Sequence, residues 1–447
     1  MSARPRRSGV AAVLLALAMA LVPFRPAAAD PNPVTPGDFR GFGFDQCLAP
    51  TQRAMDKWLN HSPFLSVGIY ISGDSRACRS QPNLTPAWIS TQLRRGWVLL
   101  PITLGPQASC SDRFPRYGND PVIDDRPGPG DGFPYARRQG RAEAVKAVDA
   151  AKALGIVPRS TLWYDLEGFD HTLRRCRESA LAFLSAWTTK LHDLKYVSGV
   201  YSSAGSGIKM LDDVRVERPG AYTLPDMIWI ARWDGVANTS TSYIRSDGWL
   251  PGGRVKQYLG GHDETWGGVT INIDRNYLDL GRGGHAPPEQ HCGGVDLDLA
   301  RYPALREPSD GYTPTANKVR ALQCLLTERG LYAGKLSGNY NPATIEAVQA
   351  WQESRGFAVS TTWSVANWVG ILSQGASYAQ KIGSAGPHVR RVQRALNAAD
   401  PTLRRAVDGI FTRTTAKDVR AYQRRVGLGD SGIVNKRTWE RMRAGRS

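Results

Sequence analysis

The 447-residue sequence lacks several motifs on which common hydrolytic sites are built. Its seven histidines form no H-E-x-x-H pattern or other paired metal-ligand spacing, which argues against a zinc amidase. No G-x-S-x-G segment is present, so the serine nucleophile of an α/β-hydrolase is not indicated. We therefore expect neither a metal ion nor another cofactor.

Cysteine is scarce, and its six copies show no C-x-x-C spacing. An even number in an exported chain predicts three disulfides rather than a thiol nucleophile. Cys292 and Cys324 flank a domain boundary, and we expect them to pair. The remaining four allow three pairings that the sequence leaves open, and they are Cys47, Cys78, Cys110 and Cys176.

After its first 30 residues the chain has no apolar run long enough to cross a membrane. Those first residues combine the cations Arg4, Arg6 and Arg7 with an apolar stretch at 11–24 and three alanines at 27–29. This order is typical of a signal peptide, which we place at 1–29. We expect a secreted protein, extracellular or associated with the cell wall, without a transmembrane segment after cleavage.

Acidic residues are outnumbered, and the formal net charge is +17. From His388 onward the chain has 13 Arg and 2 Lys against 4 Asp and 1 Glu, so the excess is concentrated there. A field of this sign attracts polyanions. For an exported protein these are peptidoglycan carboxylates and anionic wall polymers, and we expect no nucleic-acid partner.

Between residues 39 and 280, short apolar runs alternate with helical patterns, which predicts a (β/α) barrel or a doubly wound sheet. Only Gly260 to Val269 separate the last two runs, too few residues for a parallel crossover, so these strands should be antiparallel. The segment before the seventh run also lacks a helical period. We expect a barrel that is irregular in its last three units. The strand-like runs are 41–45, 66–71, 97–104, 161–167, 197–202, 227–233, 254–259 and 270–274, and the helical patterns are 51–59, 86–95, 136–154 and 177–194.

The C-terminal part of the chain is duplicated. Val319-Arg-Ala-Leu-Gln323 parallels Val389-Arg-Arg-Val-Gln393, and Trp351-Gln352 parallels Tyr422-Gln423. Each copy contains three helical patterns, which predicts two small all-α three-helix modules at 318–375 and 386–445. The Gly- and Pro-rich segment 281–317 is interpreted as a linker.

The clearest catalytic candidates are Asp165 and Glu167, at the end of the fourth run. Residues i and i+2 of a strand point to one side, and barrel enzymes place their sites where strands end. Two carboxylates about 5 to 9.5 Å apart are what glycoside hydrolysis requires. Asp170 lies on the loop just beyond them and is a candidate substrate contact.

Two further carboxylates, Asp45 and Asp274, end the first and last runs, which lie side by side in a closed barrel. We expect them at the same mouth, where clustered acids raise one another's pKa. Four aromatic residues are candidates either for stacking on sugar rings or for barrel packing: Trp163, Trp229, Trp233 and Tyr258.

These segments resemble glycoside hydrolase family 25 lysozymes and, more closely, the related glycoside-hydrolase-like domain of secreted actinobacterial proteins. The resemblance covers about 39–280 and rests on Phe44-Asp45-Gln-Cys47-Leu-Ala-Pro50, Tyr164-Asp165-Leu-Glu167, Trp229-Ile-Ala-Arg-Trp233, Gln257-Tyr258 and Val269-Thr-Ile-Asn-Ile-Asp274-Arg-Asn276. It implies an irregular TIM-like barrel.

The same resemblance implies roles for the carboxylates: Glu167 as general acid, Asp165 as its anionic partner, and Asp45 and Asp274 as supporting groups. Gln257 and Asn276 join the aromatics as candidate substrate contacts. The two repeats resemble the three-helix peptidoglycan-binding module. We expect a wall-bound glycoside hydrolase that cleaves peptidoglycan or a related glycan, with a non-catalytic glycan-binding protein as the alternative.

Overall fold

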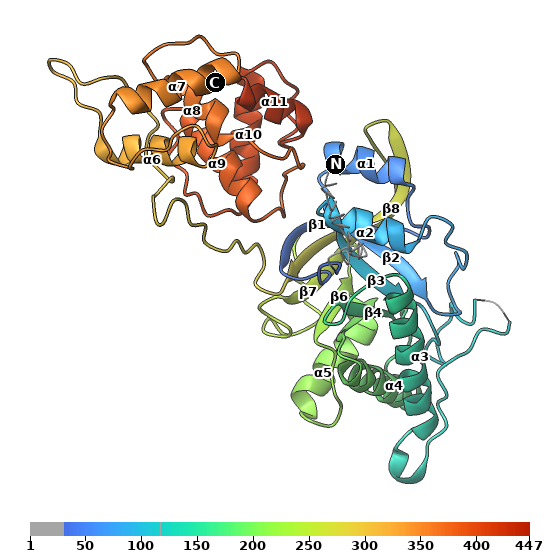
Figure 1. Ribbon diagram of the computed structural model, residues 1–447. Helices are drawn as coiled ribbons and strands as arrows, with labels where there is room; N and C mark the ends of the chain where they lie inside the picture. The colour runs from blue at the N-terminus through green and yellow to red at the C-terminus, as the bar shows by residue number, and fades with distance from the viewer. Residues whose placement is uncertain (1–30, 117) are drawn as a thin grey trace, which may run out of the picture. The chain divides into compact units, whose positions relative to one another are not determined.

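The computed structural model describes residues 31–116 and 118–447, and the signal peptide expected at 1–29 lies outside them. Eight strands close a barrel in the order of the sequence. Five helices accompany the first five strands (Figure 1). The strands are β1 (Phe39–Asp45), β2 (Ser66–Ser72), β3 (Val98–Thr103), β4 (Thr161–Asp165), β5 (Val197–Ser203), β6 (Met227–Ala231), β7 (Gly253–Trp266) and β8 (Val269–Leu280), and the helices are α1 (Gln52–His61), α2 (Pro86–Arg94), α3 (Pro134–Ala153), α4 (Arg174–Asp193) and α5 (Lys209–Glu217).

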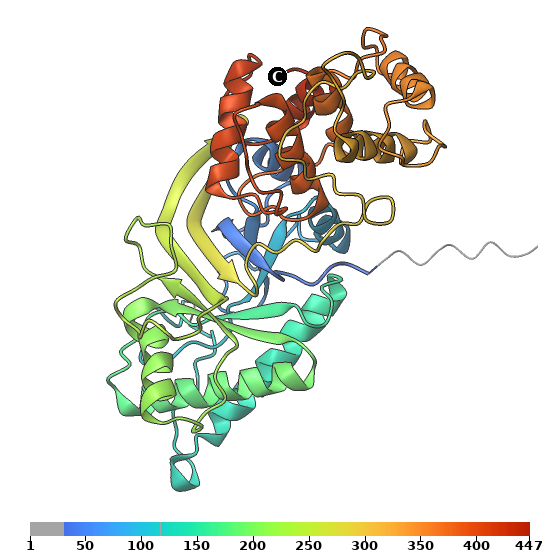
Figure 2. The same ribbon diagram turned by 90° about the vertical axis from the view of Figure 1, so that its left-hand side faces the viewer.

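The last two strands form a long antiparallel hairpin, seen as the two yellow arrows of Figure 2. Gly267 and Gly268, both with positive φ (58° and 76°), make its two-residue turn. That backbone suits a two-residue hairpin and strongly favours glycine. The expected antiparallel pairing is confirmed, although the hairpin extends beyond the two short runs seen in the sequence. β8 also pairs antiparallel with β1 and so closes the barrel.

The connection from β6 to β7 contains no helix, as the sequence indicates. Two buried cations on β7 hold this loop instead. Arg254 donates to the carbonyl oxygens of Gly248, Arg245 and Ser246, and Lys256 Nζ lies 3.0 Å from Asp234 Oδ2. Polar contacts to β7 thus replace the packing that a helix supplies elsewhere in the barrel.

The barrel interior is filled by aromatic side chains. Trp163 and Trp229 have 0% and 1% of their surface exposed, and their rings meet edge to face with centroids 5.6 Å apart. Tyr164, the next residue of β4, points outward and packs on Phe183 and Trp187 of α4. Strand alternation therefore sends Trp163 and Asp165 inward and Tyr164 to the helical layer.

The C-terminal region contains three helices in each repeat, as the duplication predicts. The repeated glutamines explain the pattern. Gln323 accepts from the backbone N–H of Gly338, and Gln393 accepts from that of Gly409. Because these buried side chains close the loop before the middle helix, the spacing recurs in both copies. The helices are α6 (Ala316–Thr327), α7 (Pro342–Ser354) and α8 (Val365–Leu372), then α9 (Pro387–Ala399), α10 (Arg413–Arg425) and α11 (Lys436–Arg443).

The two repeats share one hydrophobic core, and part of the expected linker belongs to it. Leu297, Tyr302 and Leu305 are buried there, and Trp368 of α8 donates to the carbonyl oxygen of Pro303. The second half of 281–317 is therefore packed against the helices, because its apolar side chains complete their core. The first half is also attached to them, through the Cys292–Cys324 disulfide and an ion pair between Glu289 and Arg394.

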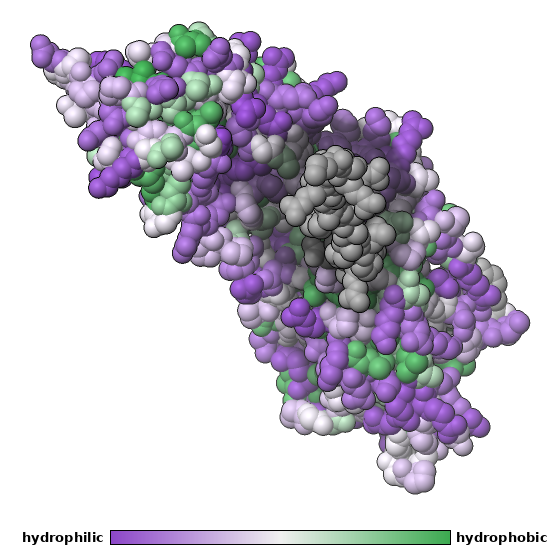
Figure 3. Space-filling model, viewed as in Figure 1, coloured by the Kyte–Doolittle hydropathy of each residue, from purple (hydrophilic) through white to green (hydrophobic). Residues whose placement is uncertain are grey.

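Three disulfides join Cys47 to Cys78, Cys110 to Cys176 and Cys292 to Cys324. The last is the pair expected from the sequence. Among the described residues, no helix is long and apolar enough to cross a membrane. Hydrophilic residues cover most of the face shown in Figure 3, and hydrophobic ones are scattered over it.

Candidate active site

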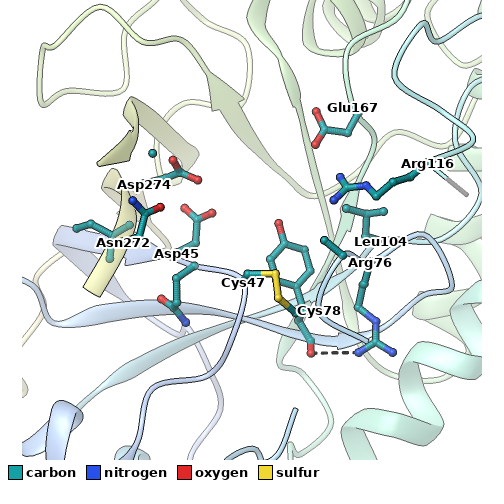
Figure 4. Close-up of a pocket in the computed structure, with 14 residues that line it drawn as sticks. Asp45, Cys47, Arg76, Cys78, Leu104, Arg116, Glu167, Asn272 and Asp274 are labelled. Atoms are coloured by element: carbon teal, nitrogen blue, oxygen red, sulfur yellow. Dashed lines mark hydrogen bonds between the residues drawn. A yellow bond between two sulfur atoms is a disulfide. The ribbon is translucent and has the colours of Figure 1, made fainter. Parts of the chain in front are cut away.

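Carboxylates from both ends of the barrel sequence line one pocket of about 230 Å³. Asp45 ends β1, Asp274 lies on β8, and Glu167 follows β4 by two residues. Figure 4 shows Asp45 and Asp274 on one side of this pocket, with Glu167 and Arg116 on the other. The disulfide Cys47–Cys78 also lines it. We call this space the carboxylate pocket.

Asp45 and Asp274 stand directly opposite each other in the β1–β8 ladder. Burial and the neighbouring Asp274 charge raise the pKa of Asp45 well above its usual value. Asn276 Nδ2 donates to Asp45 Oδ1 over 2.6 Å, and Gln257 Nε2 lies 3.2 Å from the same atom. These amides hold Asp45 in place at the edge of the pocket.

Asp165 lies beneath the pocket surface, 2% exposed. Tyr70 donates its hydroxyl to Asp165 Oδ2 over 3.2 Å, whereas Oδ1 has no hydrogen-bond partner among the described residues. The Gln107 side chain joins the two catalytic candidates: it donates to the Asp165 carbonyl oxygen and accepts from the Glu167 N–H. The loop after β3 thereby fixes the loop after β4.

Burial raises the pKa values of all four carboxyls. For Asp165, burial and the Glu167 charge raise the pKa well above its usual value. Burial also raises the pKa of Glu167, but the guanidinium groups of Arg113 and Arg116 oppose this. Burial raises the pKa of Asp274 to about 6. The site therefore holds protons at mildly acidic pH, as an acid catalyst must.

Several residues expected to contact substrate lie too deep to do so. Trp163, Trp229 and Tyr258 are at most 5% exposed, so they fill the fold and offer no face to a sugar. Gln257 and Asn276 are 2% and 0% exposed and bind Asp45 instead. Burial in successive side-chain layers explains these corrections, since alternation in a strand shows direction but not depth.

Trp233 differs from the other aromatic candidates. Its side chain is exposed, it lines a neighbouring cavity, and its indole N–H donates to Gln257 Oε1 over 2.9 Å. Asp170 lies on the loop, where its carboxylate accepts from the backbone N–H and hydroxyl of Thr172. The Asp170 carboxylate is therefore engaged in a local turn, and Asp170 lines neither of the two cavities beside Glu167.

Sequence reasoning missed four contributors to this site, namely Tyr70, Gln107, Arg113 and Arg116. Tyr70 could have been predicted, because it lies near the carboxyl end of a strand at the same mouth of the barrel. The other three come from an irregular loop without periodicity, so no pattern marks them. In the described chain, one cluster has metal-ligand spacing, Cys292, Cys324 and Glu328, and a disulfide occupies both of its cysteines.

Comparison with known proteins identifies the domains. Residues 56–278 match the model of the Rv2525c-like, glycoside hydrolase-like domain. Residues 315–361 and 385–442 each match the putative peptidoglycan binding domain. A comparison with curated proteins finds no significant match.

Solved structures that resemble the chain do so remotely. The Mycobacterium tuberculosis Tat-secreted protein Rv2525c is 13% identical, with a TM-score of 0.35 over 54% of this chain and 97% of its own. The Clostridium perfringens spore cortex lytic enzyme SleM is 14% identical, with a TM-score of 0.35 over 54% and 67%. The modular autolysin LytC of Streptococcus pneumoniae is 11% identical, with a TM-score of 0.33 over 53% and 46%.

The family models, and not these remote likenesses, decide the assignment. Residues 56–278 belong to the Rv2525c-like, glycoside hydrolase-like domain family, and two putative peptidoglycan binding domains follow them in the chain.

Proposed function

We propose that the barrel hydrolyses a β-linked wall glycan, with Glu167 as general acid. The observation that carries this proposal is the position of Glu167: it lines two adjoining cavities, so a glycan crossing from one to the other places a glycosidic bond beside it. Asp165, two residues earlier, lies below as a second carboxyl. A pair of this kind is what acid-assisted glycoside cleavage uses.

Each carboxyl has a distinct part in this proposal. Glu167 protonates the leaving oxygen as the glycosidic bond breaks, and water then adds to the oxocarbenium-like centre and returns a proton to Glu167. Asp165 lies buried beneath the pocket, and burial and the Glu167 charge raise its pKa well above the usual value. Asp45 and Asp274 are two further carboxyls across the pocket, and burial raises the pKa of each.

The helical region would hold the enzyme on its substrate. Two peptidoglycan binding domains and a basic C-terminal repeat support attachment to peptidoglycan and anionic wall polymers. Three disulfides fit an oxidising, extracellular setting. We propose that the protein is secreted and acts at the cell wall.

The test is release of reducing sugars from purified cell wall. Glu167→Gln removes the transferable proton while nearly preserving shape, so activity should fall about 10²–10⁴-fold while wall binding persists. Glu143→Gln is the matched control: Glu143 is also a buried glutamate with a raised pKa, but it lies on α3 and lines neither cavity. It should keep activity near that of the wild type.

A wild-type rate unchanged by Glu167→Gln would overturn the assignment of the acid. If the wild-type protein bound glycan through the barrel but released no sugar from any wall preparation, the hydrolase proposal would be wrong and the barrel would be a glycan-binding domain.

A further inference from the structure

A second cavity of about 450 Å³ adjoins the carboxylate pocket and shares Glu167 with it. Its walls come from the loops after β3, β4, β5 and β6. We call it the arginine pocket, because Arg113 and Arg232 line it and Glu167 is its one acidic wall residue.

Two aromatic rings in the arginine pocket rest on glycines. A Cβ atom at Gly260 would lie 2.5 Å from the Trp233 ring, and one at Gly205 would lie 2.9 Å from the Tyr243 ring. Each ring therefore lies close against backbone on one side. The residues nevertheless remain 62% and 40% exposed, so they keep surface available to a ligand. Sugar rings commonly pack on such flat apolar faces.

The two guanidinium groups are available to an anion. Arg113 Nη1 lies 4.0 Å from Glu167 Oε2, at the outer limit of an ion pair, and its side chain is 75% exposed. Arg232 lies over the Tyr243 ring, 5.2 Å from its centroid, and forms no ion pair within 4 Å in the described chain. Its neighbour Asp234 is already engaged by Lys256.

The loop that carries Arg113 is anchored beside Glu167. Cys110 is disulfide-bonded to Cys176 of α4, and Ser111 Oγ donates to the carbonyl oxygen of Gly168 over 3.1 Å. Phe114 is buried, 6% exposed. These contacts place Arg113 beside Glu167 on the wall of the arginine pocket, so its position is built into the fold.

We propose that the arginine pocket is a subsite for a carboxylate-bearing sugar, whose ring packs on Trp233 and whose carboxylate binds Arg113 and Arg232. This inference deepens the proposed function and rests on it. Guanidinium groups bind carboxylates in planar, often bidentate geometry. The carboxylate is either the lactyl group of a muramic acid unit that carries no stem peptide or the ring carboxylate of a uronic acid.

The experiment measures binding rather than hydrolysis, so loss of activity does not affect its reading. The full mature chain is titrated calorimetrically with an N-acetylglucosaminyl–muramic acid disaccharide, with the same disaccharide after reduction of its carboxyl to an alcohol, and with a glucuronate disaccharide. Wild-type protein should bind the acid about 3–10-fold more tightly than the alcohol, as expected for a partly exposed ion pair.

Arg113→Gln combined with Arg232→Gln should bring the acid-to-alcohol preference to about one. Arg141→Gln, which removes a cation from the exposed face of α3, should keep the preference. Trp233→Ala should weaken binding of both sugars alike. Each single arginine substitution should reduce the acid-to-alcohol preference by less. The single variants replace the double variant in the test if the double variant does not fold.

A preference for the acid that survives both arginine substitutions would overturn the proposal, and so would equal binding of acid and alcohol by the wild type. The glucuronate arm identifies the source: tighter binding of glucuronate than of the muramic disaccharide indicates a uronic acid, and the reverse indicates muramic acid.

Discussion

At the scale of single residues, the Asp45–Asp274 pair makes stability depend on pH. The pKa of Asp274 is raised to about 6 from 3.8 by burial, so the folded protein binds a proton that the unfolded chain releases. Stability is then greatest below about pH 4 for this group and is lost as pH rises through 6. The loss amounts to about 3 kcal/mol at most.

Asp274→Asn tests this relation. The amide can donate to Asp45 without a titratable proton, so the variant should be more stable than the wild type at pH 7.5 and should gain less on acidification to pH 4.5. Thermal unfolding at the two pH values measures both effects. An equal shift of Tm with pH in both proteins would show that the pair does not retain a proton on folding.

Arg113 should set the upper pH limit of catalysis. Its guanidinium group opposes the rise in the pKa of Glu167 that burial causes. Arg113→Gln should therefore raise that pKa, and the general acid should stay protonated to higher pH. The pH profile of kcat should lose its upper limb at higher pH than in the wild type. Arg141→Gln, at an exposed residue of α3 that lines neither pocket, should leave the profile unchanged.

At the scale of elements, the β6–β7 connection depends on Lys256, whose surface is 0% exposed. Its ammonium group donates to Asp234, Asn238 and the carbonyl oxygen of Ser240. Lys256→Met should cost on the order of 3 kcal/mol, because it leaves these polar partners unpaired around an apolar side chain.

Lys209→Met is the matched control, since it also removes a lysine–aspartate pair, with Asp213, but from the partly exposed surface of α5. It should cost only about 0.5 kcal/mol. Urea unfolding of both variants measures the difference. Similar losses in the two would mean that the buried contacts of Lys256 do not stabilise the loop.

Hydrophobic periodicity in the sequence predicted most elements of the barrel. All eight strand-like runs and the first four helical patterns correspond to elements of the barrel. The helix α5 was not identified, because its nine residues follow an irregular π-helical turn at Ala204–Ile208 that obscures the start of the pattern. A short helix without a side-chain N-cap leaves little local signal.

At the scale of the whole molecule, the helical region has its own core, which includes residues before α6. A fragment of residues 290–447 retains Leu297, Tyr302, Leu305 and the Cys292–Cys324 disulfide, whereas 318–447 loses the three apolar side chains and the disulfide. The longer fragment should have a clearly higher Tm, because each fully buried apolar side chain contributes about 1.5–3 kcal/mol.

The longer fragment also tests the proposed attachment to peptidoglycan. The 290–447 fragment should co-sediment with purified peptidoglycan, and added salt should reduce the bound fraction, since exposed charges are screened beyond about 8–10 Å. Failure to sediment at low salt would contradict the proposed attachment. If the 318–447 fragment had the same Tm as the 290–447 fragment, residues 290–317 would not stabilise the helical core.

What the sequence alone determined is what local pattern and chain order encode. Chain order placed Asp165 and Glu167 at the end of one strand, the shortness of 260–269 required an antiparallel pair, and repeated glutamines marked two modules. Only the tertiary structure decided how deeply each side chain is buried and which distant residues it contacts. Trp163 and Asp165 share one face of β4 and both are buried, whereas Glu167 lines the pocket, because barrel closure fills the interior in layers. Arg113 reaches Glu167 from a loop some fifty residues earlier, and only the folding of that loop against the barrel mouth brings the two charges together.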